Sequence, residues 1–83
     1  MPEQIDILKL KVGDKVHYQP EHYKDGEFEN GLIKEIPEFA FDKDHMYFNN
    51  IRVVYNCNGE WHRYKDYTSA LTNIRDLKLG WME

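Results

Sequence analysis

Turn-forming residues divide this 83-residue chain into segments that are too short for helices of ordinary length. Gly13 opens the first turn, and Pro20 and Pro37 each end a segment because proline cannot donate to a strand ladder. Between Gly13 and Pro20, apolar and polar side chains alternate at the period of a half-buried strand, which predicts a short strand at residues 15–19. The next strand is expected at residues 31–36, where Pro37 ends it.

The clearest hairpin signal lies in the second half of the chain. Residues 51–55 are β-branched and aromatic, and Asn58-Gly59 tolerates the positive φ values of a tight hairpin turn. We therefore expect residues 61–64 to return as a strand beside residues 51–55. A last short strand, preceded by a helical turn, is expected within residues 67–72.

Two stretches are less regular. Residues 21–30 are polar and charged, which predicts a long early loop. Residues 38–44 carry Phe39 and Phe41 at strand spacing, so we interpret this stretch as a ragged hairpin arm.

The end of the chain carries a helix-capping signal. Asn73 has a side chain that can accept a backbone N–H, which predicts a capped single turn over residues 73–77. Leu79 and Trp81 are then expected to cover one end of the core.

Short strands at regular intervals, one long loop and no long helix indicate a small closed sheet. We predict a single mainly β domain over residues 1–83, an SH3-like barrel of about five short strands with a short helical turn near the C-terminus. The alternative is a β-meander packed by one helix over residues 64–77. The chain length leaves room for one core.

Cys57 is the only cysteine, so no intrachain disulfide can form and a reducing, cytoplasmic location is expected. The first ten residues lack the basic start and apolar run of a signal peptide, and no stretch is apolar enough to span a membrane.

Charge is unevenly distributed over a chain of net charge −4. Residues 21–44 contain eight acids against three lysines, whereas residues 51–81 contain five basic residues against three acids. An acidic middle and a mildly basic end can give a folded domain two electrostatic faces.

Three segments, Val12 to Val16, Gly31 to Ile36 and Ile51 to Tyr55, resemble the strand order of KOW-type, Tudor-type and other SH3-like barrels. The runs 55–61, 64–72 and 76–81 are similar to small uncharacterised proteins of bacterial prophages and mobile elements. The first resemblance implies a barrel that binds RNA, DNA or protein, and the second implies no activity.

Residues that could carry chemistry are scattered. The histidines and the cysteine are not spaced like a metal site, and no glycine-rich phosphate loop is present. His17 is expected to face solvent, and Cys57 is expected to be a partly exposed structural thiol without the orienting groups of a nucleophile, although His62 could approach it. Asp42 and Asp44 lack the glycine of a calcium loop. We therefore expect no enzyme activity, no metal and no cofactor.

Aromatic residues make up 14% of the chain. Tyr18, Tyr67 and Trp81 are assigned to the core, whereas residues in the polar loop and beside the expected hairpin are candidates for ligand binding. These candidate binding residues are Tyr23, Trp61, Arg63, Tyr64 and Lys65.

The favoured function is a non-catalytic binding module that recognises a protein through an aromatic face and the acidic loop, acting as a monomer or weak dimer. One alternative is nucleic-acid binding by a KOW-like basic face formed by Arg52, Arg63, Lys65 and Arg75. Another is an acidic phage-type inhibitor that occupies the nucleic-acid groove of a host enzyme. The overall acidity argues against the first alternative.

Overall fold

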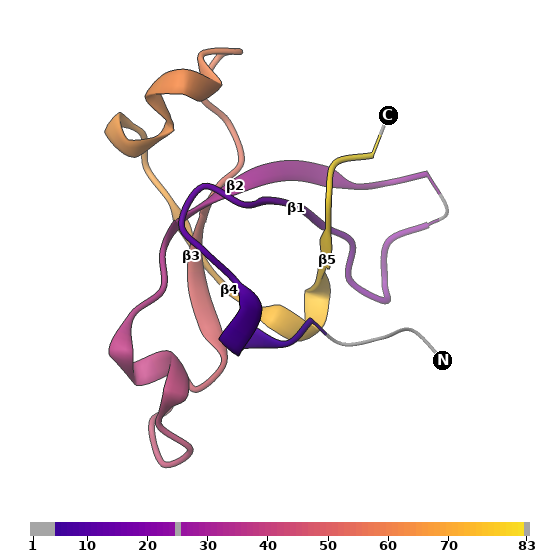
Figure 1. The fold of residues 1–83 in the computed structure, drawn as a ribbon. Coiled ribbons are helices and arrows are strands. Elements are labelled where there is room, and N and C mark those ends of the chain that lie inside the picture. Colours follow the sequence, from indigo (N-terminus) through magenta and orange to yellow (C-terminus); the bar gives the residue numbers. More distant parts are fainter. Residues whose placement is uncertain (1–4, 25, 83) are drawn as a thin grey trace.

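A computed structural model describes residues 5–24 and 26–82 of the chain (Figure 1). Its strands are β1 (Lys15–Tyr18), β2 (Glu29–Glu35), β3 (Asn50–Val54), β4 (Ala70–Asn73) and β5 (Leu77–Leu79). Four short 3-10 turns join or precede them: η1 (Ile7–Lys9), η2 (Glu38–Phe41), η3 (Trp61–Asp66) and η4 (Ile74–Asp76). Among the described residues, no helix is long and apolar enough to cross a membrane.

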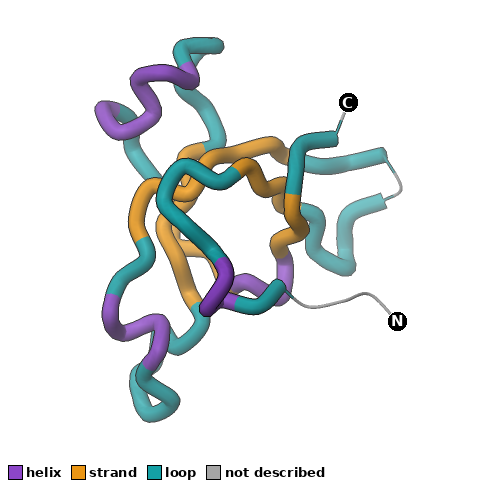
Figure 2. Tube along the Cα trace, in the orientation of Figure 1, coloured by secondary structure: helices purple, strands orange, loops and turns teal. Residues whose placement is uncertain are grey.

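All five strands lie in one antiparallel sheet of order β4-β3-β2-β1-β5. The last strand returns to pair with the first, so that Val16 lies opposite Leu79 and Tyr18 opposite Leu77. Figure 2 shows the strands curving around a common centre. The mainly β fold class is confirmed, with five short strands, a long loop before β2 and a short helical turn near the C-terminus.

The core is aliphatic and lies on the inner face of the curved sheet. Val16, Ile33, Ile51 and Val53 are completely buried there, as the alternation in each strand requires. The residues that complete the core cluster are Ile5, Leu10, Ala40, Ile74 and Leu77. Rings of the half-buried Tyr18 and Tyr55 pack against its margin, where the inner face opens toward solvent.

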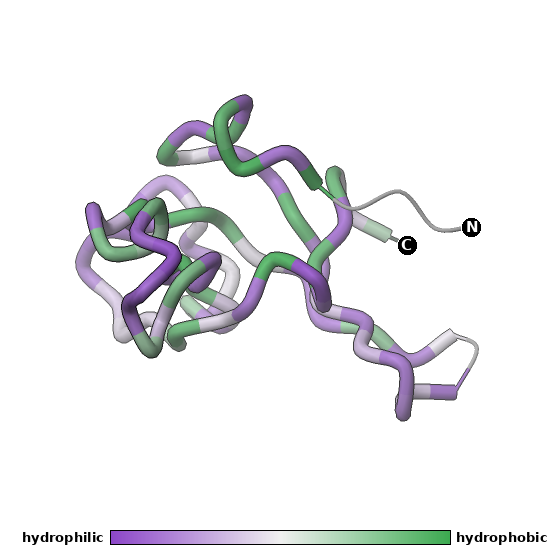
Figure 3. Tube along the Cα trace, turned by 90° about the horizontal axis from the view of Figure 1, so that it is seen from below, coloured by the Kyte–Doolittle hydropathy of each residue, from purple (hydrophilic) through white to green (hydrophobic). Residues whose placement is uncertain are grey.

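The loop between β1 and β2 contains the polar stretch predicted from the sequence. Figure 3 shows it as a hydrophilic projection from the body of the domain. Two contacts hold the loop against the domain. The Gln19 side chain donates to the Glu27 carbonyl over 3.1 Å, and Tyr23 packs edge-on against Tyr18.

The predicted hairpin between residues 51–55 and 61–64 is wrong. Asn58 and Gly59 do adopt positive φ values of 54° and 80°, but the chain then forms η3 instead of a strand, and β3 pairs with β4. In η3 the Trp61 side chain makes a long-range contact, with its ring centroid 4.8 Å from that of Trp81. The alternative helix over residues 64–77 is also wrong, since that stretch forms the end of η3, then β4 and η4.

The predicted hairpin arm over residues 38–44 is wrong as well. Pro37 precedes η2 with extended backbone, and the helical turn directs Ala40 into the core, where it is fully buried. The Ala40 carbonyl then accepts the N–H of Asn49 over 2.9 Å, which closes the loop onto β3.

Two exposure predictions are wrong. His17 is buried because its Nδ1 lies 2.8 Å from the Gly80 carbonyl, which holds the ring beneath the C-terminal segment. Cys57 is also buried, with 1% of its surface exposed. Its turn folds back on itself through a hydrogen bond from the Glu60 N–H to the Cys57 carbonyl.

The C-terminal segment crosses β2 at Gly31. The Trp81 indole donates to the Gly31 carbonyl over 2.8 Å. The Asn30 side chain forms two further hydrogen bonds with the Met82 backbone: it donates to the Met82 carbonyl and accepts the Met82 N–H. A Cβ on Gly31 would lie 2.7 Å from a Val53 methyl and 2.8 Å from the Val54 carbonyl, so this position has no room for a side chain.

Candidate functional site

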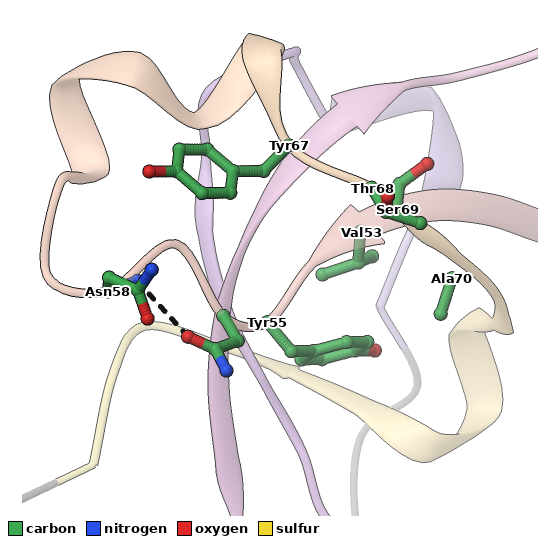
Figure 4. Close-up of a pocket in the computed structure, with 8 residues that line it drawn as sticks. Val53, Tyr55, Asn58, Tyr67, Thr68, Ser69 and Ala70 are labelled. Carbon is green, nitrogen blue, oxygen red and sulfur yellow. Dashed lines mark hydrogen bonds between the residues drawn. The ribbon is translucent and has the colours of Figure 1, made fainter.

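Three adjacent hollows lie along one side of the domain and share wall residues. The first, of about 450 Å³, is lined by Val53, Tyr55, Asn56, Asn58, Tyr67, Thr68, Ser69 and Ala70 (Figure 4). The second, of about 420 Å³, is lined by Tyr18, Glu29, Asn50, Tyr55, Ala70, Leu71, Thr72, Asn73 and Asp76. The third, of about 520 Å³, is lined by Tyr18, Pro20, Glu21, His22, Arg75 and Asp76. We call the three hollows together the tyrosine groove.

Tyr55 separates the first two hollows and is held firmly. It follows β3 on the same side as Ile51 and Val53, so its ring continues the core outward. Its hydroxyl lies 2.8 Å from the Thr72 hydroxyl on β4. Burial raises the pKa of the Tyr55 hydroxyl well above the ordinary value, an effect that the Thr72 hydrogen bond opposes and nearby Glu29 reinforces. The hydroxyl therefore stays protonated at physiological pH.

Tyr18 stands between the second and third hollows. It ends β1 on the same side as Val16, and its ring meets that of Tyr55 at 5.9 Å and that of Tyr23 at 5.4 Å, both edge-on. Edge-to-face contacts of this kind are favourable because the positive ring edge meets the negative ring face. The three rings form a connected aromatic surface.

Tyr67 and Tyr55 lie on opposite sides of the first hollow, and Val53 and Ala70 line it from one side (Figure 4). The Tyr67 hydroxyl donates to the Glu60 carboxylate over 2.6 Å. This hydrogen bond and burial raise the pKa of the Tyr67 hydroxyl. The hydrogen bond to Glu60 thus fixes the position of the Tyr67 ring, which lines the hollow.

The middle and far end of the groove are acidic. Glu21, Glu29 and Asp76 line it against the single guanidinium of Arg75, whose Nε lies 4.0 Å from the Asp76 carboxylate. Burial and the Glu29 carboxylate both raise the pKa of Tyr23 beside Tyr18. The groove can therefore hold an apolar or cationic side chain between tyrosine rings.

The predicted binding residues fall into two separate places. Tyr23 packs on Tyr18, a wall residue of the tyrosine groove, whereas Trp61, Arg63, Tyr64 and Lys65 lie on η3, at the upper left of Figure 1. One of the four η3 residues, Trp61, contacts the C-terminal segment. Trp61 packs on Trp81, and the Lys15 ammonium lies 4.7 Å from the Trp81 ring centroid.

The residues of the predicted basic face do not gather. They come from β3, η3 and η4, which lie in different parts of the domain (Figure 1). Arg52 pairs with Glu35 at 3.0 Å and Arg63 with Asp66 at 3.4 Å, so carboxylates already occupy these guanidinium groups. Lys65 lies over the Tyr64 ring at 6.0 Å.

Sequence reasoning missed four residues of the groove: Tyr55, Thr72, Glu29 and Asp76. Tyr55 was assigned only to a strand, although its place on the face of Ile51 and Val53 was readable from the alternation. Tyr18 and Tyr67, which were assigned to the core, are half-buried and line the groove as well.

No group of three or more His, Cys, Asp or Glu side chains is arranged to hold a metal ion within residues 5–24 and 26–82. Comparison of the chain with known protein families, curated proteins and solved structures found no match. The site is therefore interpreted from its own geometry, and the resemblance to prophage and KOW-type proteins stays a prediction.

Proposed function

We propose that this domain is a non-catalytic recognition module that binds an extended segment of a partner protein in the tyrosine groove. The observation that carries the proposal is the row of adjoining hollows walled by Tyr67, Tyr55 and Tyr18. Successive hollows suit an extended chain, which presents successive side chains along its length.

The chemistry of the walls supports a protein ligand. Tyrosine supplies a large apolar surface and a polar hydroxyl at little cost in side-chain entropy, and it is enriched in protein-binding surfaces for that reason. Here the Tyr55 and Tyr67 hydroxyls already have partners, which pre-organises both rings. A pre-organised surface loses less entropy when a ligand binds.

A nucleic-acid ligand has less support. Phosphate binding needs several cationic groups that converge, and the charged groups lining the groove are three carboxylates and one guanidinium. The η3 turn combines Trp61 and Tyr64 with two basic residues, but its arginine is paired with acids. Both surfaces are included in the test below.

The test is a selection from a phage-displayed library of random dodecapeptides on the immobilised full chain. Enriched peptides are then synthesised and their affinities measured for the wild type and for Ala70→Trp. Ala70 is exposed and lines the first two hollows, so a tryptophan there fills the groove without disturbing the core. Leu79→Trp, at an exposed β5 position outside the groove, is the matched control.

We expect Ala70→Trp to weaken binding at least about tenfold, and Leu79→Trp to leave it unchanged, because steric filling removes the contacts of a buried ligand side chain. Enriched peptides that bind both variants as tightly as the wild type would overturn the proposal. If Arg63→Ala weakened peptide binding and Ala70→Trp did not, the binding site would lie on η3 instead of the groove.

A further inference from the structure

One strand beside the groove has an unpaired edge. Within the described residues, β4 pairs with β3 alone, and it stands at the end of the sheet order. Four consecutive β4 residues, Ala70 to Asn73, line the second hollow. An edge strand presents a row of backbone N–H and C=O groups that a further strand can bind.

The register of β4 identifies which groups point outward. The Ile74 N–H donates to the Asn49 carbonyl over 2.9 Å, one step beyond the pair formed by Asn50 and Asn73. Since hydrogen-bonded pairs alternate in an antiparallel ladder, Ala70 and Thr72 bond to β3. We infer that the backbone groups of Leu71 and Asn73 point away from β3.

The groups on the other side of the same hollow fit a cation. Glu29 and Asp76 both line it, together with the rings of Tyr18 and Tyr55. An ammonium or guanidinium placed against these rings and beside the two carboxylates gains both cation–π and ion-pair attraction. The third hollow adds the Glu21 carboxylate at the adjacent position.

We propose that the partner segment adds to the β4 edge as a sixth strand and places a lysine or arginine side chain in the second hollow, against the rings of Tyr18 and Tyr55 and beside Glu29 and Asp76. This proposal rests on the function proposed above and specifies its ligand: an extended segment with a basic residue at the centre. Main-chain hydrogen bonds to Leu71 and Asn73 supply sequence-independent affinity, and the acidic hollow supplies selectivity.

The other sheet edge fits such a partner less well. β5 has three residues, so it offers a shorter edge than the four residues of β4. Its Lys78 side chain lies 3.4 Å from the Gln19 side chain, so the charge beside this edge is positive and would repel a basic segment.

The main-chain part of the proposal is tested by amide hydrogen exchange on the ¹⁵N-labelled full chain, with and without the peptide most enriched in the selection. Exchange at Leu71 and Asn73 is expected to slow at least about tenfold on binding. Ala70 and Thr72 are internal controls, because their amides already bond to β3. Unchanged exchange at Leu71 and Asn73 in a peptide-saturated sample would overturn strand addition.

The cation part is tested by replacing the central basic residue of the peptide with glutamine and, separately, by Glu29→Gln in the domain. Each change is expected to weaken binding about fivefold and to reduce its salt dependence. Glu38→Gln, at an exposed acid outside the groove, is the matched control and is expected to have no effect.

The outcomes separate the two proposals. Peptides that bind the groove but lack a basic residue, or leave Leu71 and Asn73 unprotected, overturn this inference while the recognition function stands. A selection that enriches no groove-binding peptide overturns both. Protection of Leu71 and Asn73 that rises with protein concentration in the absence of peptide would show that β4 pairs with a second copy, and would also overturn the inference.

Discussion

The hydroxyl groups of Tyr55 and Thr72 lie 2.8 Å apart and join the end of β3 to β4 beneath the tyrosine groove. Thr72 is buried and Tyr55 is half-buried, so each hydroxyl has lost much of its contact with water. This contact fixes the ring that divides the groove.

The first prediction concerns the strength of this contact. Tyr55→Phe is expected to lower the free energy of unfolding by about 1 kcal/mol, because it leaves the buried Thr72 hydroxyl without this partner. Thr72→Val is expected to cost a similar amount, and the double variant less than the sum of the two. Urea denaturation of the four proteins measures the coupling. Strict additivity would show that the hydroxyl contact contributes nothing.

The second prediction concerns pH. The pKa of Tyr55 is raised in the folded state by burial, so folding favours the protonated hydroxyl. This contribution is complete below the unfolded-state value of about 10 and is lost as the pH rises above it. The free energy of unfolding is measured between about pH 8 and pH 11, a range that brackets the free tyrosine pKa. Above about pH 10 it should fall more steeply for the wild type than for Tyr55→Phe. Identical pH dependence of stability in the two proteins would contradict a raised pKa for Tyr55 in the folded state.

The third prediction concerns Gly31. Gly31→Ala is expected to destabilise the domain by about 1–3 kcal/mol, because the new methyl group meets Val53 and the Val54 carbonyl. Glu29→Ala, at an exposed position of the same strand, is the control and should have a small effect. Thermal unfolding followed by circular dichroism compares the two variants. A neutral Gly31→Ala would mean that β3 approaches β2 at Gly31 less closely than described.

The fourth prediction concerns Cys57. Because its side chain is buried, the thiol of the native protein is expected to react with an aromatic disulfide reagent at least about a hundredfold more slowly than the urea-unfolded chain. Absorbance of the released thiolate follows the reaction. Equal rates in the native and unfolded chains would show that the turn after β3 is open.

Local sequence signals predicted three of the strands, part of a fourth and some of the turns. Alternation, β-branched composition and the proline breaks located β1, β2 and β3 to within two residues at each end; the strand predicted within residues 67–72 overlaps β4, and β5 was not predicted. The Asn73 side chain caps η4 as expected, accepting the Arg75 N–H over 3.0 Å. Both signals are local, since a strand face or a cap is set by neighbours in the sequence.

The missed elements depend on contacts between distant residues. Residues 61–64 have side chains suited to a strand, yet they form η3, where Trp61 packs on Trp81 twenty positions away. His17 has the place of an outward residue in the alternation, but the Gly80 carbonyl covers it. Tertiary packing overrides local propensity at such positions.

The groove was only partly predictable for the same reason. Its walls come from β1, the segment after β3, and β4, which meet through sheet topology alone. The surplus of aromatic residues led to the prediction of a binding surface, and one of its candidate residues, Tyr23, packs on the groove residue Tyr18. The partnership of Tyr55 with Thr72, seventeen positions apart, had no signal in the sequence.

The most direct test of the recognition function is an NMR titration of the ¹⁵N-labelled domain with the most enriched peptide. The account predicts that the largest amide shift changes map to Tyr18, Tyr55 and residues 67–73, and that Ala70→Trp abolishes them. Changes confined to residues 61–66 and the C-terminal segment, with the tyrosine groove unaffected, would contradict it.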